Sequence, residues 1–397
     1  MPHAALAWSA TVALIVALLL FDYFFHIRTA HVPSLGEAAR WSGFYVGVAL
    51  LFGAALFAFG GTEMGTEYFA GYVTEKALSL DNVFVFIVIM SSFAVPREDQ
   101  QKALLIGIVL SLVVRTAFIF VGAALIERFT WVFYVFGLVL LVTAGQLLVP
   151  ADQRRAADPA DSLMVRIARK LVPTTDFYDG DKLLTLHDGH RRMTPMVLVI
   201  VALGATDVLF ALDSIPAIFG LTENVFIVFS ATAFSLLGLR QLYFLVGGLL
   251  ERLLYLPYGL AAILGFIGAK LVLHALHENR LAFINDGMPV KVVEIGTRLS
   301  LIVIVATLAI TIVVSLLSPK GKAKSAVTAL RQHLAAYLDP HGPTDAAERT
   351  RLYGQLVAAE RHVAALDPAL KGLIRDPETL RMQLAEAHRR QAAVPAG

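Results

Sequence analysis

The stretch Thr74–Phe86, TEKALSLDNVFVF, decides the fold of this chain. It places Glu75, Asp81 and Asn82 in or at the edge of a long apolar segment. Ionisable side chains inside a membrane-spanning segment are costly and usually functional. The stretch therefore predicts a spanning helix that carries part of a buried polar site.

The same pattern returns 132 positions later as Thr206–Phe219, TDVLFALDSIPAIF. Asp207 and Asp213 take the places of the two acids of the first copy, and Ser214 takes the place of its amide. A single buried acid could be an accident of sequence. Two copies with the same spacing indicate one mechanism that uses both.

The composition is that of a membrane protein. Of 397 residues, 57% are hydrophobic and only 16% are charged, and the mean hydropathy is +0.69. These values are too apolar for a soluble globular chain and predict an all-α polytopic membrane protein. The chain has no cysteine, which excludes disulfides and thiolate metal sites.

Several function classes are disfavoured by what the sequence lacks. It has no basic stripe with interleaved aromatic residues, so we expect no nucleic-acid partner. It has no phosphate-binding glycine loop, which argues against transport driven by ATP in this chain alone. The apolar runs carry no nucleophile–base pair, so we expect no enzyme activity and no permanently bound cofactor.

Runs of about 17 to 25 apolar residues mark candidate spanning helices. The first run reads as a retained helix rather than a cleaved signal. The third is long and polar, and Glu63, Glu67, Gly61, Gly65 and Gly71 in or beside it predict a helix that enters, breaks and resumes. We predict nine spans, near residues 6–26, 41–60, 63–94, 103–126, 129–149, 195–220, 224–249, 257–276 and 297–318.

The basic residues between the spans predict the orientation. With the N-terminus outside, the inner loops carry thirteen Lys or Arg residues and the outer loops carry four, among which Lys76 is counted. Residues 150–194 are then a cytoplasmic linker, with a regulatory metal or partner site as the alternative. Residues 319–397 become a cytoplasmic helical tail that packs on itself or on the membrane surface, or that serves for dimerisation or docking.

An internal repeat extends beyond the acidic motifs. Arg115 and Gly122 match Arg240 and Gly247, with a step of seven residues in both copies. Each copy holds three helices, and an odd number makes the second copy enter the membrane from the opposite side. Inverted repeats recur in transporters, with the substrate site near the midplane. The predicted segments are 1–62 (two helices), 63–149 (repeat 1), 150–194, 195–276 (repeat 2), 277–318 (outer loop and last span) and 319–397.

The repeated polar residues predict a cation site. Carboxylate, amide and hydroxyl oxygens suit Mg²⁺, Ca²⁺ or Mn²⁺ rather than Zn²⁺ or Cu²⁺. Several acids in an apolar interior cannot all stay ionised without partners, so a cation, or protons that exchange with it, would balance them. Three basic residues can neutralise part of the charge: Arg115, Arg240 and Lys270. The candidate ligands are Asp81, Asp207, Asp213, Glu75, Asn82, Ser214 and Glu67.

Two other interpretations of the charged residues stay open. The acids could pair with Arg115 and Arg240 only to fix the helix register. Glu67 and Glu75 could guard an outer vestibule instead of binding the ion. Asp22, near the end of the first helix, is expected to be interfacial.

At these residues the chain resembles the TerC family of integral membrane proteins, over roughly residues 40 to 318. The resemblance rests on GTEYFAGYVTEKALSLDNVFVFIVIMSSF, from Gly65, and on ATDVLFALDSIPAIF, from Ala205. The family is named for tellurite resistance, and its bacterial members are associated with manganese efflux. The resemblance implies that the acidic positions of both motifs serve this function. It does not extend to the tail after Pro319.

Together these observations predict a divalent-cation exporter of the bacterial cytoplasmic membrane. Mn²⁺ is the expected substrate, alternating access the expected mechanism, and protons the expected counter-ion. The partners are the lipid bilayer and the metal ion, with a homo-oligomer or a cytoplasmic protein as a further partner through residues 319–397. The alternative is a membrane scaffold or assembly factor for metal or tellurite stress that acts through the linker and the tail.

Overall fold

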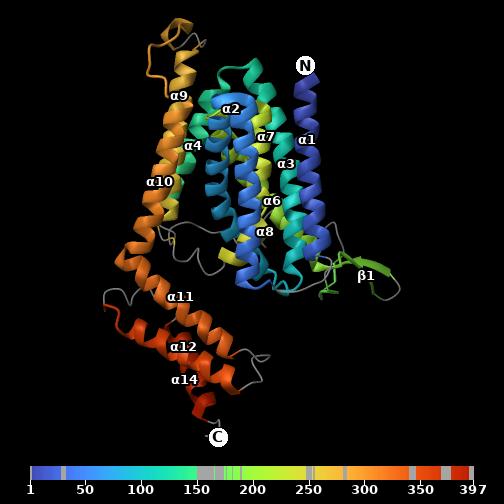
Figure 1. Cartoon of the computed structure of the whole chain (residues 1–397), viewed down its shortest axis with the longest axis vertical. Helices are drawn as coiled ribbons and strands as arrows, with labels where there is room; N and C mark the ends of the chain where they lie inside the picture. Colours follow the sequence, from blue (N-terminus) through green and yellow to red (C-terminus); the bar gives the residue numbers. More distant parts are fainter. Residues whose placement is uncertain are drawn as a thin grey trace. The chain divides into compact units, whose positions relative to one another are not determined.

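The structure is a computed structural model, and the chain is almost entirely helical (Figure 1). It divides into two compact units, which we describe separately: residues 1–245 with 257–309, and residues 246–256 with 310–397. The residues that the structure describes are 2–27, 33–149, 165, 174–175, 177–180, 182–187, 190–246, 253, 255–279, 284–338, 346–367 and 377–392.

Seven helices of the described residues are long and apolar enough to cross a membrane. They confirm an all-α polytopic membrane fold, because a helix satisfies its own backbone hydrogen bonds and can therefore lie in lipid. Another apolar helix, α4 (Val132–Leu148), is shorter. The seven are α1 (Pro2–Asp22, continued by the π-helix Tyr23–Ile27), α2 (Leu35–Ser92), α3 (Gln100–Arg128), α6 (Pro195–Phe219), α7 with α8 (Val225–Leu236 and Leu239–Val246), α9 (Leu256–His277) and α10 (Thr297–Leu317).

The helix α2 folds back on itself at Gly61, whose backbone has φ 87° and ψ 175°. A continuous helix would hold Ala49 and Tyr68 about 28 Å apart. Instead the Tyr68 hydroxyl donates to the Ala49 carbonyl at 3.0 Å, and the rings of Phe57 and Phe69 stack with centroids 5.7 Å apart. The element is therefore an antiparallel helical hairpin, with arms 35–60 and 62–92 side by side (Figure 1).

Of the three glycines that predicted a break near the third span, only Gly61 forms one, and it lies just before that span. Gly61 is the one non-helical residue within α2, while Gly65 and Gly71 keep helical geometry, so the arm 62–92 is unbroken. A break occurs instead between α7 and α8, where Leu237 is extended and Gly238 has φ 79°. Glycine adopts such positive φ values without strain, and both breaks use one.

We expect the substitution Gly61→Ala to destabilise the chain by about 1–3 kcal/mol, because φ 87° with ψ 175° is almost exclusive to glycine. No atom lies within 4 Å of the methyl group that it would add, so the cost is that of the backbone alone. Gly47→Ala is the matched control. Gly47 has equally open surroundings within the helix, and alanine there should be neutral or stabilising by up to about 1 kcal/mol.

Unfolding of both variants in detergent checks this prediction. Equal stability of the Gly61→Ala protein and the wild type would mean that the hairpin turn tolerates a side chain.

Small residues let the central helices approach one another. A methyl group built on Gly107 of α3 would lie 3.0 Å from a side-chain carbon of Leu203 in α6, and one on Gly204 would lie 2.6 Å from a carbon of Leu110. Close backbone approach of this kind is how spanning helices gain packing energy where lipid offers no hydrophobic force. The hairpin α2 packs on α7 and α6, and α3 packs on α6 and α7. The helices that carry both sequence motifs therefore meet in the middle of this unit.

The predicted linker 150–194 lies mostly outside the described residues. Its described end forms an antiparallel hairpin of β1 (Leu184–His187) and β2 (His190–Met193), in which Leu184 pairs with Met193. The Tyr178 hydroxyl donates to the Phe93 carbonyl at 2.7 Å and ties this segment to the end of α2.

The second unit contains the tail helices α11 (Pro319–Leu338), α12 (Ala346–Ala364) and α14 (Pro377–Ala392). They share a core of their own, built around Leu330, Leu334, Leu356 and Leu380. His388 bridges α12 and α14, with Nδ1 2.8 Å from the Tyr353 hydroxyl and Nε2 3.1 Å from Oε2 of Glu360.

Candidate functional site

Arg115 of α3 is the centre of the buried polar site, and its side chain is fully enclosed. Nη1 contacts the Glu75 carboxylate of α2, and Nη2 lies 3.0 Å from Oδ1 of Asp207 in α6. Nη1 also donates to the Ser214 hydroxyl at 3.1 Å. One guanidinium thus joins the first motif to the second.

The position of this cluster along the helices is central. Asp207 lies twelve residues from each end of α6, which runs from Pro195 to Phe219. Glu75 lies fourteen residues beyond the turn at Gly61 and seventeen before the end of α2 at Ser92. Both acids are therefore on the order of 18 to 25 Å from the helix ends along the helix axes.

Asn82, Asp81 and Asp213 complete the repeated motifs around Arg115. Asn82 is buried, and its amide oxygen accepts from Nη2 of Arg115 at 3.0 Å in the orientation that also lets its nitrogen donate to Leu78. Asp81 and Asp213 are only partly buried, and their charges lie close enough to interact with each other. The site thus has two acids held on Arg115 and two that are more accessible.

Lys76 corrects the sequence prediction that placed it in an outer loop. It lies within α2, and its Nζ donates to the Ser235 carbonyl at 3.0 Å, just before α7 ends at Leu236. The Ser79 hydroxyl lies 3.4 Å from the Ser235 hydroxyl at the same place. A cation at a helix C-terminus is favourable, because the last carbonyls there have no helical partner. In the sequence, the position of Lys76 directly after Glu75 could have indicated that it lies within the helix rather than in a loop.

Acidic side chains outnumber basic ones at this centre. Four carboxylates (Glu75, Asp81, Asp207 and Asp213) gather around Arg115, which contacts Glu75 and Asp207 directly. Buried charges need partners, and an excess in an apolar interior is relieved by protons or by a bound cation. Oε2 of Glu75 is fully buried and has no hydrogen-bond partner among the described residues.

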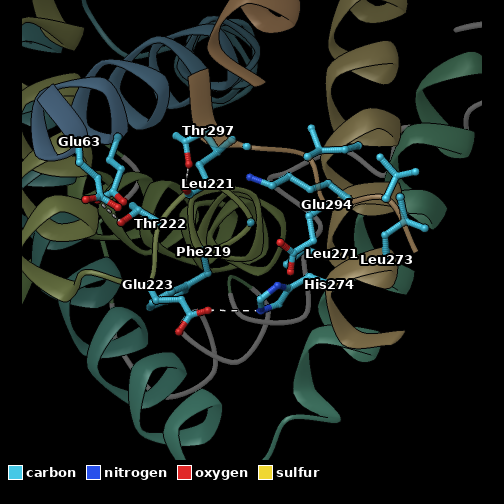
Figure 2. A pocket seen from close by; sticks show the side chains of 16 residues that line it. Glu63, Phe219, Leu221, Thr222, Glu223, Leu271, Leu273, His274, Glu294 and Thr297 are labelled. Atoms are coloured by element: carbon cyan, nitrogen blue, oxygen red, sulfur yellow. Dashed lines mark hydrogen bonds and ion pairs between the residues drawn. The ribbon is translucent and has the colours of Figure 1, made fainter. Parts of the chain in front are cut away.

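Glu67 and Lys270 lie elsewhere, in an acidic vestibule at one end of the helices. Figure 2 shows this cavity with Glu63, Glu223 and His274 among its labelled residues. This cavity of about 510 Å³ is lined by the end of α6, the start of the arm 62–92, the end of α9 and the start of α10. The Thr222 hydroxyl donates to Oε2 of Glu67 at 2.7 Å, and the charge of Lys270 acts on the same carboxylate. The interpretation of Glu67 as a vestibule residue therefore fits its position, while Glu75 belongs to the central cluster.

Two histidines at the end of α9, His274 and His277, pair with glutamates at or near the vestibule. Nε2 of His274 lies 3.4 Å from Oε1 of Glu223 in the α6–α7 connection, and this contact holds the pKa of Glu223 below its ordinary value. Nε2 of His277 lies 3.0 Å from Oε1 of Glu294. Four glutamates and one lysine among the lining residues give the vestibule a negative potential: Glu63, Glu67, Glu223, Glu294 and Lys270.

Arg240 does not join the central cluster, although the repeat matches it to Arg115. Its Nη2 lies 2.7 Å from Oδ1 of Asp22, and its Nη1 donates to the Gln101 side chain. Gln241 and the Tyr45 hydroxyl donate to the same Asp22 carboxylate at 2.8 and 3.0 Å. Asp22 is the last residue of α1 and is only 6% exposed, because these side chains cover it.

We call Asp22, Tyr45, Gln101, Arg240 and Gln241 the Arg240 cluster. The internal repeat did not predict this cluster, because Asp22 belongs to α1, which lies outside both copies of the repeat. Gly247, the other repeat position of the second copy, lies outside the described residues.

A preformed metal-ligand set is not seen in the described part of the chain. No group of three or more His, Asp or Glu side chains there is arranged to hold a metal ion. The reason is visible at the centre, where the guanidinium of Arg115 lies between Glu75 and Asp207. A cation could take its place only if Arg115 moved.

Comparison with known proteins gives a family match and several full-length relatives. The family model for integral membrane proteins of the TerC family matches residues 60–323. The uncharacterized membrane protein Rv2723 of Mycobacterium tuberculosis is 52% identical over 390 residues, which cover 98% of both chains. No solved structure matches the chain.

Two shorter relatives match the membrane part. A membrane protein of Myxococcus xanthus is 39% identical over 266 residues, 67% of this chain and 83% of the relative. A protein of Escherichia coli named as a membrane-bound redox modulator, Alx, is 36% identical over 277 residues, 68% of this chain and 86% of the relative.

Proposed function

Because this chain belongs to the TerC family of integral membrane proteins, we propose that it is a secondary transporter that exports a divalent cation, with Mn²⁺ as its substrate. The observation that carries the proposal is the set of repeated carboxylates that gathers around Arg115, in the middle of the arm 62–92, α3 and α6. Its carboxylate, amide and hydroxyl groups are hard oxygen ligands of the kind that Mn²⁺ prefers.

Arg115 stabilises the ion-free state of the transporter in this mechanism. Its guanidinium neutralises Glu75 and Asp207 while no metal is bound, so neither carboxylate is left as an isolated buried charge. The more accessible Asp81 and Asp213 make the first contact with the ion. Displacement of Arg115 then frees the two held carboxylates, and the Asn82 amide and Ser214 hydroxyl complete the oxygen set.

The acidic vestibule is the outer opening of the route. Its glutamates favour cations over anions, and Lys270 limits the excess of negative charge. We place the N-terminus outside and the C-terminus in the cytoplasm, in the plasma membrane of a bacterium. Protons that exchange with the metal on the same carboxylates are the counter-ion.

The architecture that this mechanism needs is a pair of inverted repeats within nine spans. The two arms of α2 and the short α4 supply the additional spans. Contacts of α2 with α7 and of α3 with α6 pair the first helix of each repeat with the second helix of the other, as a two-fold axis requires.

Ion uptake into inverted vesicles that contain the purified chain tests the proposal. We expect uptake of Mn²⁺ that a pH gradient accelerates, and slower uptake of Ca²⁺ and Mg²⁺. Zn²⁺ should not be a preferred substrate. Empty vesicles treated in the same way are the control. Uptake no faster than in empty vesicles for all four ions would overturn the proposed transport.

A second function is favoured by one observation, the separate core of the tail helices. A folded unit of this kind suits a scaffold that recruits stress-response partners. Deletion of residues 319–397 would then abolish metal tolerance of cells, while changes to the central acids would be tolerated. The transporter proposal expects the reverse. A thiol redox role, which the name of the Escherichia coli relative could suggest, is not available to a chain without cysteine.

A further inference from the structure

Two cavities of the membrane unit, one at each end, differ greatly in size. At one end the vestibule encloses about 510 Å³ beside Glu63 and Glu67. At the other end the cavity beside Arg240 and Gln241 encloses about 10 Å³, which is room for about one water molecule. The arm 62–92 of α2 connects the two, because it begins beside the vestibule and ends near Gln101 of α3.

We propose that the Arg240 cluster is the inner gate of the route, and that Asp22 and Arg240 are positioning residues which decide when the central site opens to that side. This inference rests on the proposed transport, since a gate has meaning only for a route. It adds residues from α1 and α8 that the two sequence motifs do not contain.

The contacts of the cluster suit a closure that can open again. Arg240, Asp22 and Gln101 are each at least 94% buried and join α1, α3 and α8. The ion pair of Asp22 with Arg240 is balanced in charge. A neutral, hydrogen-bonded pair seals a passage without attracting the transported cation, and its polar groups can be hydrated when the helices part.

The helix break at Gly238 links this gate to the central site. Ser235, whose carbonyl accepts from Lys76, lies three residues before Gly238, and Arg240 lies two residues after it. A methyl group built on Gly238 would lie 2.8 Å from Cβ of Tyr45, which is itself a member of the gate. The short helix α8 can therefore turn about Gly238 when charge at Lys76 and Glu75 changes, and it carries Arg240 with it.

The test uses the absence of native cysteine, which makes any introduced cysteine unique. The substitution Ser79→Cys places a thiol four residues past Glu75 on the gate side, at a position that is fully buried. Its rate of reaction with a membrane-impermeant maleimide is measured in right-side-out and in inverted vesicles. We expect slow labelling from the Arg240 side, and an increase of at least about tenfold when Arg240→Gln is added.

Two further variants separate gating from loss of structure. Asp22→Asn removes the other charge of the pair and should give the same increase from the same side. Arg298→Gln is the matched control, because Arg298 lies at the vestibule end, 3.4 Å from the Thr62 hydroxyl, and should leave labelling from the Arg240 side unchanged. Folding is checked by gel filtration and by the melting temperature of each purified protein.

Each result decides the proposal. Unchanged labelling in both folded gate variants would overturn it, as would equal increases from both sides of the membrane. Maleimide labelling needs no metal. If labelling increases as expected in a protein that does not transport Mn²⁺, the proposed gate stands and the proposed substrate is wrong. Transport of Mn²⁺ with unchanged labelling would reject the gate alone.

Discussion

Replacing Arg115 with methionine is expected to lower the free energy of unfolding by about 3–5 kcal/mol, the largest loss we predict for a single residue. Methionine fills similar space but leaves Glu75 and Asp207 without a positive partner in the fully buried centre. Unfolding of the purified protein in detergent, followed by circular dichroism, measures the change.

Neutralising the two acids should reverse this loss. In the triple variant that adds Glu75→Gln and Asp207→Asn, no uncompensated charge remains on them, and we expect most of the stability to return. Arg97→Met, at an exposed position before α3, is the control and should change stability by no more than about 0.5 kcal/mol. If Arg115→Met were as stable as the wild type, the two carboxylates would already be protonated in the native protein.

The second large effect is expected for Asp213→Asn, this time on transport rather than stability. The change removes one of the two accessible carboxylates but none of the contacts that hold Arg115. Loss of a supporting group around a metal costs about 10- to 100-fold in affinity or activity, and loss of a direct ligand should cost at least as much. We therefore expect the initial rate of Mn²⁺ uptake to fall by at least that factor.

The stability of this variant should be equal to or higher than that of the wild type, because the repulsion between Asp213 and Asp81 is gone. Asp81→Asn, at the matching position of the first motif, should behave alike. Asp286→Asn makes the same chemical change in an exposed loop and serves as the control. Rapid uptake by Asp213→Asn at equal protein level would remove this residue from the ion site.

Much of the membrane unit could be predicted from the sequence because its signals are local and strong. Apolar runs set the helices, and the two copies of the acidic motif indicated that Glu75 and Asp207 belong to one site. The structure brings both onto Arg115, together with Asn82 and Ser214. Their role as metal ligands stays a prediction.

What the sequence could not give depends on contacts between distant segments. The pairing of Arg240 with Asp22 joins residues 218 positions apart, and only one of them belongs to the repeat. The glycines of the third span all look alike in sequence, yet only Gly61 adopts a positive φ, because the chain must reverse there. Lys76 was misplaced because a lysine at the edge of an apolar run usually marks a loop, whereas here a helix end accepts it.

The tight turn at Gly61 has a consequence for how the chain enters the membrane during synthesis. A single non-helical glycine joins the two arms of α2, and the Tyr68 hydroxyl of one arm donates a hydrogen bond to the Ala49 carbonyl of the other. No polar loop has to cross the lipid between them, and each arm satisfies its own backbone hydrogen bonds. We expect the ribosome-bound chain to insert residues 35–92 as one paired unit, so that a stop after residue 60 would leave an arm that stays poorly anchored.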